Sequence, residues 1–157
     1  MKKIFLIVAF TATTLLQTSF AQDESAKITE ILTQYYAVKD ALVNGNGNLA
    51  AARAGEFVKI AGSVDHKILP EAIRTSLLRD AAAITQIKDL KKQREYFSAF
   101  SDNMAALAKS TKLSSAPVYI AYCPMKKASW LSNSSAIKNP YYGSSMLTCG
   151  KVTEILK

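Results

Sequence analysis

The stretch DLKKQREYFSAFSDNMAALAK, residues 89–109, has the clearest helical pattern in the chain. Its large apolar side chains recur at spacings of three, four and seven, at Leu90, Phe97, Phe100, Met104 and Leu107. Because a helix completes a turn about every 3.6 residues, this spacing places them on one face. The stretch therefore predicts an amphipathic helix whose apolar face packs against other helices.

Three segments that precede this stretch show the same periodicity. They are predicted to be helices at residues 23–43, 49–61 and 70–87. The sequence NGNG at residues 44–47 should end the first of them, because Gly and Asn readily adopt positive φ. Asn48 is then the expected N-cap of the second helix, and Pro70 suits the first turn of the third. Residues 62–69 could extend a helix or form a loop.

The segment after Ser110 has a different composition. A polar, proline-containing connector at residues 112–117 precedes Val118–Tyr122, whose β-branched and aromatic content is typical of a short strand. Residues 130–145, rich in Ser and Asn, are predicted to form a long ordered loop. Residues 146–156 are predicted to return as a second strand paired with the first.

The predicted fold is mainly α with a small β element. It consists of an antiparallel four-helix bundle followed by a short C-terminal β-hairpin with a long ordered loop. Residues 22–157 are long enough for a single domain with its own core. Within this domain, residues 22–110 are expected to form the helical bundle, and residues 111–157 the hairpin and loop that contain the Cys and Met residues.

Residues 1–21 have the features of a cleaved signal peptide. Lys2 and Lys3 precede an apolar run, and Ser19–Ala21 fits the small-x-small cleavage rule. We expect a mature protein that begins at Gln22, is periplasmic or secreted, and is not stably inserted in a membrane. Loss of the two lysines reduces the 20 basic residues to 18 against 12 acidic ones, a net charge of +6. Because the lysines are dispersed, nucleic acid is not an expected partner.

The C-terminal segment pairs each of the two cysteines of the chain with a methionine. Met125 follows Cys123 closely, and Met146 shortly precedes Cys149. Thiolate and thioether sulfurs form a soft donor set that favours Cu(I) over harder cations. His66, the only histidine, could complete a Cu(I) or Zn(II) site from the helical half, or could simply be solvated.

A disulfide between Cys123 and Cys149 is the alternative to metal binding. Two cysteines in an exported protein are commonly joined, and a loop of this length would contribute about 3–4 kcal/mol. The cysteine pair cannot form a disulfide and bind a metal through both thiolates at the same instant. The sequence leaves both states open. In the same alternative, Met125 and Met146 would serve only to fill the core.

The predicted loop contains a second group of candidate residues. Trp130, the only tryptophan, is expected to pack the loop against the bundle. The sequence NPYYG, which is Asn139, Pro140, Tyr141, Tyr142 and Gly143, should set the shape of the loop through its proline and glycine. Its tyrosines could also contribute to a surface for a partner protein.

The sequence does not suggest an enzyme. Glu95 and Asp102 lie two turns apart on the predicted helix, about 10 Å along its axis, and together with Arg94 are interpreted as solvated charges. No set of nucleophile, base and orienting group is recognisable, and no glycine-rich phosphate loop is present.

Several short motifs in the chain resemble an uncharacterised bacterial domain family. They are QREYFSAFS at residues 93–101, CPM at 123–125, WLS at 130–132, NPYYG at 139–143 and MLTCG at 146–150. The resemblance extends over nearly all of residues 22–157. The family occurs as short secreted proteins and is also attached to membrane-fusion adaptor subunits of copper and cation efflux systems.

Tyr122–Met125 and Cys149–Gly150 also look like fragments of the small heavy-metal-binding domain that often begins such adaptors. That domain normally continues with His-Pro, where this chain has Lys126 and Lys127. The two resemblances imply a periplasmic accessory protein for copper or heavy-metal handling, with an efflux adaptor or another periplasmic metal-handling protein as its partner. The alternative function is a disulfide-stapled protein-interaction domain with no metal role.

Overall fold

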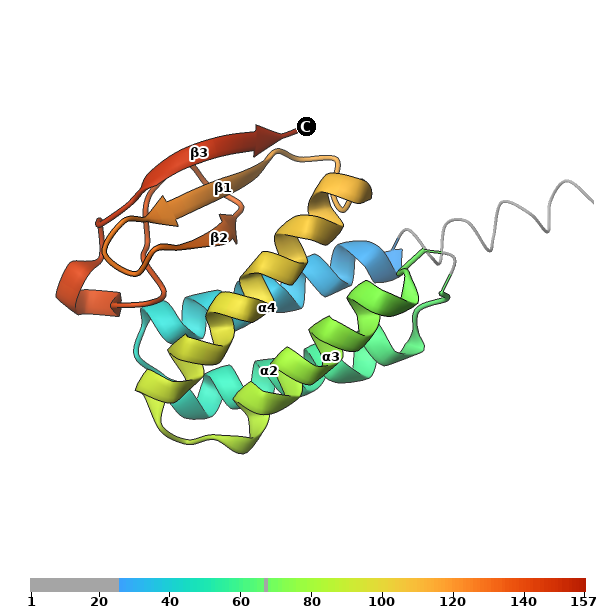
Figure 1. Ribbon diagram of the computed structural model, residues 1–157, viewed down its shortest axis with the longest axis horizontal. Helices are drawn as coiled ribbons and strands as arrows, with labels where there is room; N and C mark the ends of the chain where they lie inside the picture. Colours follow the sequence, from blue (N-terminus) through green and yellow to red (C-terminus); the bar gives the residue numbers. More distant parts are fainter. Residues whose placement is uncertain (1–25, 67) are drawn as a thin grey trace, which may run out of the picture.

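The computed structural model describes residues 26–66 and 68–157, which fold into four helices followed by a three-stranded antiparallel sheet (Figure 1). The helices are the first helix, described over residues 26–43, α2 (Gly47–Ser63), α3 (Glu71–Gln86) and α4 (Leu90–Ser110). The C-terminal elements are β1 (Val118–Cys123), β2 (Ala128–Ser132), the short 3-10 helix η1 (Gly143–Met146) and β3 (Lys151–Leu156). The predicted class, mainly α with a small β element, is confirmed. The predicted signal peptide at residues 1–21 and the mature start at Gln22 lie outside the described residues.

The helix ends follow the local capping chemistry, with one correction. Asn46, and not Asn48, is the N-cap of α2, because its side-chain Oδ1 accepts a hydrogen bond from the backbone N–H of Leu49 at 2.9 Å. Asp89 caps α4 in the same way, accepting from the N–H of Lys92 at 2.8 Å. α2 and α4 therefore start where an Asn or Asp side chain reaches the free N–H three residues further on, whereas α3 follows Pro70 without a side-chain cap.

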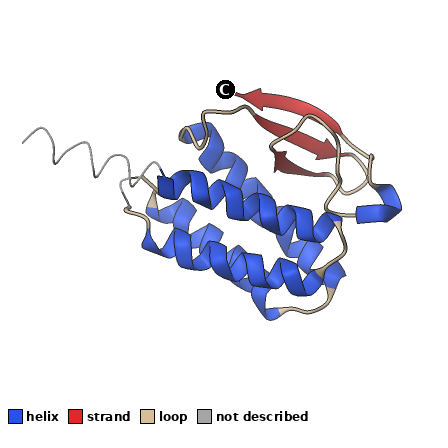
Figure 2. Cartoon of the chain, turned by 180° about the vertical axis from the view of Figure 1, so that it is seen from behind, coloured by secondary structure: helices blue, strands red, loops and turns tan. Residues whose placement is uncertain are grey.

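The sheet lies across one side of the bundle, over α4 and the first helix, while α2 and α3 lie on the other side (Figure 1, Figure 2). An aromatic cluster fills the space between these layers. Phe57 of α2 meets the ring of Phe100 at 4.7 Å, and Tyr35 of the first helix stacks on Phe97 at 5.4 Å. All four side chains are fully buried. No helix among residues 26–66 and 68–157 is long and apolar enough to cross a membrane.

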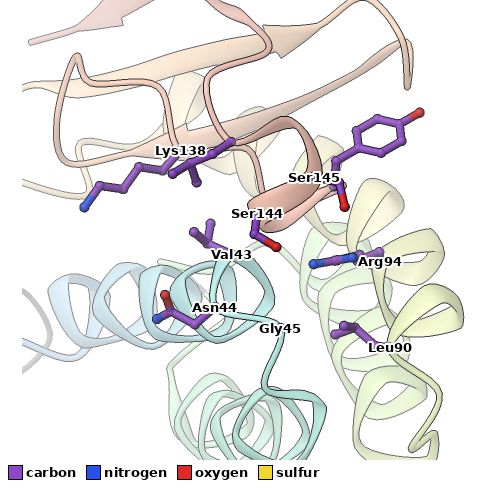
Figure 3. A pocket seen from close by; sticks show the side chains of 10 residues that line it. Val43, Asn44, Gly45, Leu90, Arg94, Lys138, Ser144 and Ser145 are labelled. Atoms are coloured by element: carbon purple, nitrogen blue, oxygen red, sulfur yellow. The ribbon is translucent and has the colours of Figure 1, made fainter.

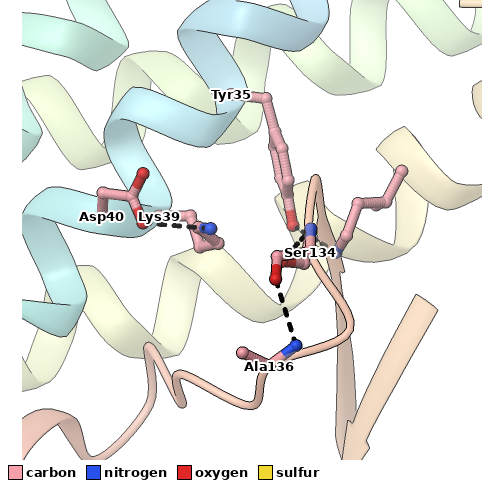
Figure 4. Close-up of polar contacts among 7 residues, drawn as sticks. Tyr35, Lys39, Asp40, Ser134 and Ala136 are labelled. Atoms are coloured by element: carbon pink, nitrogen blue, oxygen red, sulfur yellow. Dashed lines mark hydrogen bonds and ion pairs between the residues drawn. The ribbon is translucent and has the colours of Figure 1, made fainter. Parts of the chain in front are cut away.

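Tyr35 links the first helix to both α4 and the sheet. Its buried hydroxyl is 2.7 Å from Oγ of Ser101 on α4 and accepts the backbone N–H of Leu131 in β2 at 3.0 Å. Figure 4 shows the ring reaching from its helix toward the strand. Burial raises the pKa of Tyr35, so the phenol stays neutral and serves both partners.

A buried charge lies one turn beyond Tyr35 on the same helix. Lys39 is only 3% exposed, and its Nζ lies 3.0 Å from a carboxylate oxygen of Asp40 (Figure 4). The ammonium also lies 5.5 Å from the centre of the Tyr36 ring. The ion pair and the ring compensate for the loss of water around the charge, so we interpret Lys39 as structural.

The sheet has the strand order β2-β1-β3. The predicted pairing of the first strand with the C-terminal strand is confirmed, since Val118 is opposite Leu156 and Tyr122 is opposite Lys151. The prediction of a two-stranded hairpin was incomplete. Trp130 lies in β2, which pairs with β1, and not in the long loop. The strand forms because a tight four-residue turn brings Ala128 back opposite Cys123.

Candidate metal site at the end of the sheet

The two cysteines lie side by side at one end of the sheet. Cys123 is the last residue of β1 and is fully buried, while Cys149 is half-buried just before β3. Their Sγ atoms are 3.8 Å apart, and both thiols are free. The antiparallel pairing of β1 with β3 creates this proximity between residues far apart in the sequence.

Gly150 allows the chain to bring Cys149 to this position. Its φ of +144° lies in a region that other residues rarely adopt. A Cβ atom here would lie 2.8 Å from the Trp130 ring and 3.0 Å from the carbonyl oxygen of Tyr122. The glycine is therefore needed both for the backbone turn and for the close contact of the Cys149 segment with β1 and β2.

Asn139 holds the same segment from the other side. Its buried side-chain amide donates from Nδ2 to the carbonyl oxygen of Cys149 at 2.8 Å, and its Oδ1 accepts the N–H of Tyr141 at 2.8 Å. Its backbone N–H donates to the carbonyl oxygen of Leu147, also at 2.8 Å. Asn139 thus connects the start of the NPYYG sequence to the cysteine. The sequence prediction gave it a role in shaping the loop or in a partner surface, and not this contact with Cys149.

The two methionines that accompany the cysteines are exposed. Met125, in the turn between β1 and β2, is 63% exposed, and Met146, the last residue of η1, is 39% exposed. Their backbones lie close to Cys149: the carbonyl oxygen of Met146 accepts its N–H at 3.1 Å, and the N–H of Met125 lies near its thiol. Exposure of this degree argues against the core-packing interpretation of these two residues.

The surroundings keep the Cys149 thiol protonated. Its pKa is raised, first by desolvation and then by the hydrogen bond to Cys123 and the charge of that neighbour. The backbone N–H of Met125 acts in the opposite sense and lowers the pKa of Cys149. The N–H of Lys126 donates to Sγ of Cys123 at 3.5 Å. The site is therefore a hydrogen-bonded pair of thiols with amide donors available to a thiolate.

The spacing of the two sulfurs suits a thiolate-bound metal ion. Ligand sulfurs about 2.3 Å from a tetrahedral ion are about 3.8 Å apart, which matches the 3.8 Å between Cys123 and Cys149. Among the described residues, no group of three or more His, Cys, Asp and Glu side chains is placed to hold a metal ion. The other soft donors in this region are the thioethers of Met125 and Met146.

The structure does not bring His66 to the cysteines. It lies in the α2–α3 connection, where its side chain is 72% exposed and its Nδ1 is 3.5 Å from the carboxylate of Asp65. That connection lies at the opposite end of the molecule from the β1–β2 turn (Figure 1). In this arrangement His66 therefore lies apart from the cysteine pair.

The other candidate residues of the loop are mostly interior. Trp130, Asn139, Pro140, Tyr141 and Gly143 are buried, and Tyr142 is half-buried. Tyr141 packs against both Phe97 of α4 and Trp130 of β2, and its hydroxyl donates to the carbonyl oxygen of Ser129. The predicted packing of Trp130 near the bundle thus takes place through Tyr141. These side chains position the loop, and because they are mostly buried they offer little surface to a partner protein.

The family comparison concerns the helical part of the chain. A family model described as "Protein of unknown function (DUF3347)" matches residues 31–116, more than half of the 157 residues. The chain belongs to this family. The match ends just before β1, so the CPM, NPYYG and MLTCG motifs lie outside it. Comparison with curated proteins and with solved structures gave no match.

Proposed function

We propose that this protein binds one soft metal ion, Cu(I), through the thiolates of Cys123 and Cys149. The observation that carries the proposal is the 3.8 Å separation of the two sulfurs at the end of the sheet. Met125 and Met146 have backbones that lie close to Cys149 and exposed side chains, so each can turn its thioether toward the ion. This donor set is selective for a soft cation.

In this proposal the protein is a binding accessory and not an enzyme. The signal-like residues 1–21 and the resemblance to domains attached to efflux adaptors support a role in periplasmic metal homeostasis, with an efflux adaptor or another metal-handling protein as the partner. The exposed methionines also suit a transfer role, because a donor at the surface can be exchanged for one from a partner without unfolding the site.

A competition titration of the reduced protein against a Cu(I) chelator tests the proposal. We expect binding of one equivalent by the wild type and severe loss in the Cys123→Ser/Cys149→Ser variant, because a hydroxyl is a hard ligand. Met125→Leu/Met146→Leu should weaken Cu(I) binding while changing the free energy of unfolding by less than about 1.5 kcal/mol.

Met104→Leu is the matched control for the methionine variant. Met104 is fully buried in α4, so its replacement should leave the Cu(I) affinity unchanged. Equal affinities of the wild type and the Met125/Met146 variant would assign those methionines no ligand role. Absence of binding by the reduced wild type would remove the metal function.

The raised pKa of Cys149 predicts the pH dependence of binding. A thiol that is protonated in the free protein must release its proton to the solvent when the metal binds. The apparent Cu(I) affinity should therefore rise as the pH increases through the pKa of Cys149, and level off above it. Titrations at a series of pH values measure this slope. An affinity independent of pH would show that no thiol proton is displaced.

The proximity of the thiols also favours a second candidate, the disulfide-stapled interaction domain. Side-chain rotation could bring two sulfurs at 3.8 Å into bonding distance. In that state the bridge would hold the Cys149 segment against β1, and the protein would act only through contacts with a partner. Thiol counting on protein isolated without reductant separates the two candidates, since absence of free thiols favours the stapled domain.

A further inference from the structure

A pocket separate from the cysteine pair lies where the first helix ends, α4 begins and η1 crosses above them (Figure 3). Its volume is about 460 Å³, which is within the range of about 300–1,000 Å³ that is usual for small-molecule sites. Residues from three separate parts of the chain line it, so it exists only in the folded protein.

Two positively charged residues, Arg94 and Lys138, line this pocket. Its described lining residues include no Asp or Glu. Arg94 donates from Nη2 to the carbonyl oxygen of Leu42 at 2.8 Å. Its Nε is shielded from solvent and has no hydrogen-bond partner, and it forms no ion pair with a carboxylate of the described chain. The guanidinium is therefore only partly satisfied.

Arg94 corrects one sequence expectation. It was predicted to be a solvated helix charge, but it is half-buried and points beneath η1 toward Ser144 (Figure 3). Desolvation lowers its pKa, although an Arg side chain remains protonated at neutral pH. The carbonyl groups at the C-terminal end of the first helix carry partial negative charge and compensate part of the positive charge of Arg94. A bound anion would compensate the rest.

Gly143 fixes the distance between η1 and this guanidinium. Its φ is +57°, and a Cβ atom there would lie 2.5 Å from Nη2 of Arg94 and 2.8 Å from the carbonyl oxygen of Val43. The glycine lets η1 close directly over Arg94 and brings Ser144 and Ser145 to the pocket wall. The NPYYG sequence therefore shapes this pocket as well as the segment that carries Cys149.

The rest of the lining combines hydroxyl donors with apolar surface. Ser144 and Ser145 can each donate one hydrogen bond, while Val43, Leu90 and Leu147 offer aliphatic side chains. A guanidinium with neighbouring hydroxyls recognises a planar carboxylate, and an aliphatic wall recognises an apolar tail.

We propose that this pocket binds a small organic acid, with its carboxylate at Arg94 and Ser144 and its apolar tail against Val43 and Leu90. Lys138, at the rim, adds attraction for the negative charge without needing direct contact. The site goes beyond the proposed metal function and does not depend on it, because none of its ligand-contacting groups is a sulfur.

Hexanoate is a suitable probe, with hexanamide as its neutral counterpart and acetate as the analogue without a tail. Amide chemical shifts of the purified, reduced protein, followed by NMR during titration, should show saturable hexanoate binding centred on Ser144, Ser145 and Gly45. Hexanamide should bind roughly tenfold more weakly because it cannot form the charge-assisted bonds. Acetate should also bind more weakly because it lacks the apolar tail.

Variants locate the binding on the pocket. Arg94→Lys keeps a cation near the helix end but replaces the planar guanidinium and its several N–H donors with a single ammonium, and should weaken hexanoate binding several-fold. Lys138→Gln removes an exposed rim charge and should weaken binding by a smaller factor that shrinks further at high salt. Lys91→Gln, which removes another exposed charge on α4 outside the pocket, should have no such effect.

Two results would overturn the proposal. One is equal binding of hexanoate and hexanamide, and the other is a set of hexanoate shifts that lies away from the pocket or fails to saturate. If Arg94→Lys disturbs folding, Ser144→Ala and Lys138→Gln decide the question, because both side chains are exposed at the pocket and contribute nothing to the core.

Discussion

The helical bundle and the C-terminal sheet are built in different ways. The bundle core consists of many apolar side chains in regular helical spacing, among them Tyr35, Phe97 and Phe100. The cysteine site instead depends on single groups in special positions, the amide of Asn139 and the backbone of Gly150. This contrast indicates that the bundle supplies the stability of the molecule, while the sheet end holds a local geometry.

The family match follows the same division. Residues 31–116, which the family model covers, contain most of the bundle and nearly all of its connector, while both cysteines lie beyond them. The two regions are nevertheless joined, because Tyr141 lies between Phe97 of α4 and Trp130 of β2 at centroid distances of 5.9 and 6.0 Å. Substitutions that destabilise the bundle should therefore also disturb the cysteine site, whereas substitutions at the cysteine site should affect the bundle less.

The largest effect should come from the centre of the bundle. Phe100 is fully buried and meets the rings of Tyr35, Phe57 and Phe97, so Phe100→Ala should lower the free energy of unfolding by about 3–5 kcal/mol. Urea denaturation followed by circular dichroism measures the loss. A cost below about 1 kcal/mol would contradict the view that this cluster is the main source of stability.

Gly150→Ala should have the next largest effect, about 2–4 kcal/mol, from the unfavourable φ and from the contacts with Trp130 and the Tyr122 carbonyl. It should also weaken Cu(I) binding by displacing Cys149. Gly62→Ala is the control, since Gly62 is helical with nothing near its Cβ position, and should stabilise the protein by about 0.5–1 kcal/mol. If Gly150→Ala left Cu(I) binding intact, the geometry argued for Cys149 would be wrong.

Asn139→Ala sharpens the comparison further. It leaves the N–H of Tyr141 and the carbonyl oxygen of Cys149 without their side-chain partner, at a cost of about 1–3 kcal/mol. The effect should be concentrated in the loop and β3, where hydrogen exchange should accelerate while α2 and α3 remain protected. Uniform acceleration across all helices would mean that the two regions unfold as one unit.

The smallest effect tests a helix end. Asn46→Ala should cost about 1 kcal/mol because it removes the N-cap of α2, whereas Asn48→Ala, at an exposed position inside the helix, should stay within about 0.5 kcal/mol of the wild type. Thermal unfolding of the two variants distinguishes these values. The opposite order would restore Asn48 as the cap that the sequence first suggested.

The bundle was predictable because helical periodicity is a local signal. Helix positions could be predicted to within a few residues from the apolar face that runs from Leu90 to Leu107 and from the helix-ending NGNG sequence at residues 44–47. The pairing of β1 with β3 was predictable for a related reason, since Val118–Tyr122 carries strand-forming residues and β3 was the segment left to pair with it.

The details of the C-terminal region were not predictable, because they depend on contacts between distant residues. Trp130 and Leu131 form a strand in a polar context that indicates a loop, and only pairing with β1 makes them one. The roles of Asn139 and Arg94 depend on the carbonyl oxygens of Cys149 and Leu42, which no local pattern connects to them. The proline after Asn139 was the only signal that this residue has a fixed conformation.

The position of Trp130 gives the molecule an intrinsic optical probe. It is the only tryptophan of the chain, it is buried, and its ring lies against Gly150, the residue after Cys149. Indole fluorescence responds to nearby sulfur, to bound metal ions and to the entry of water. When tryptophan is excited selectively, the emission of the unlabelled protein therefore reports events at the cysteine pair, while the tyrosines of the helices are not excited.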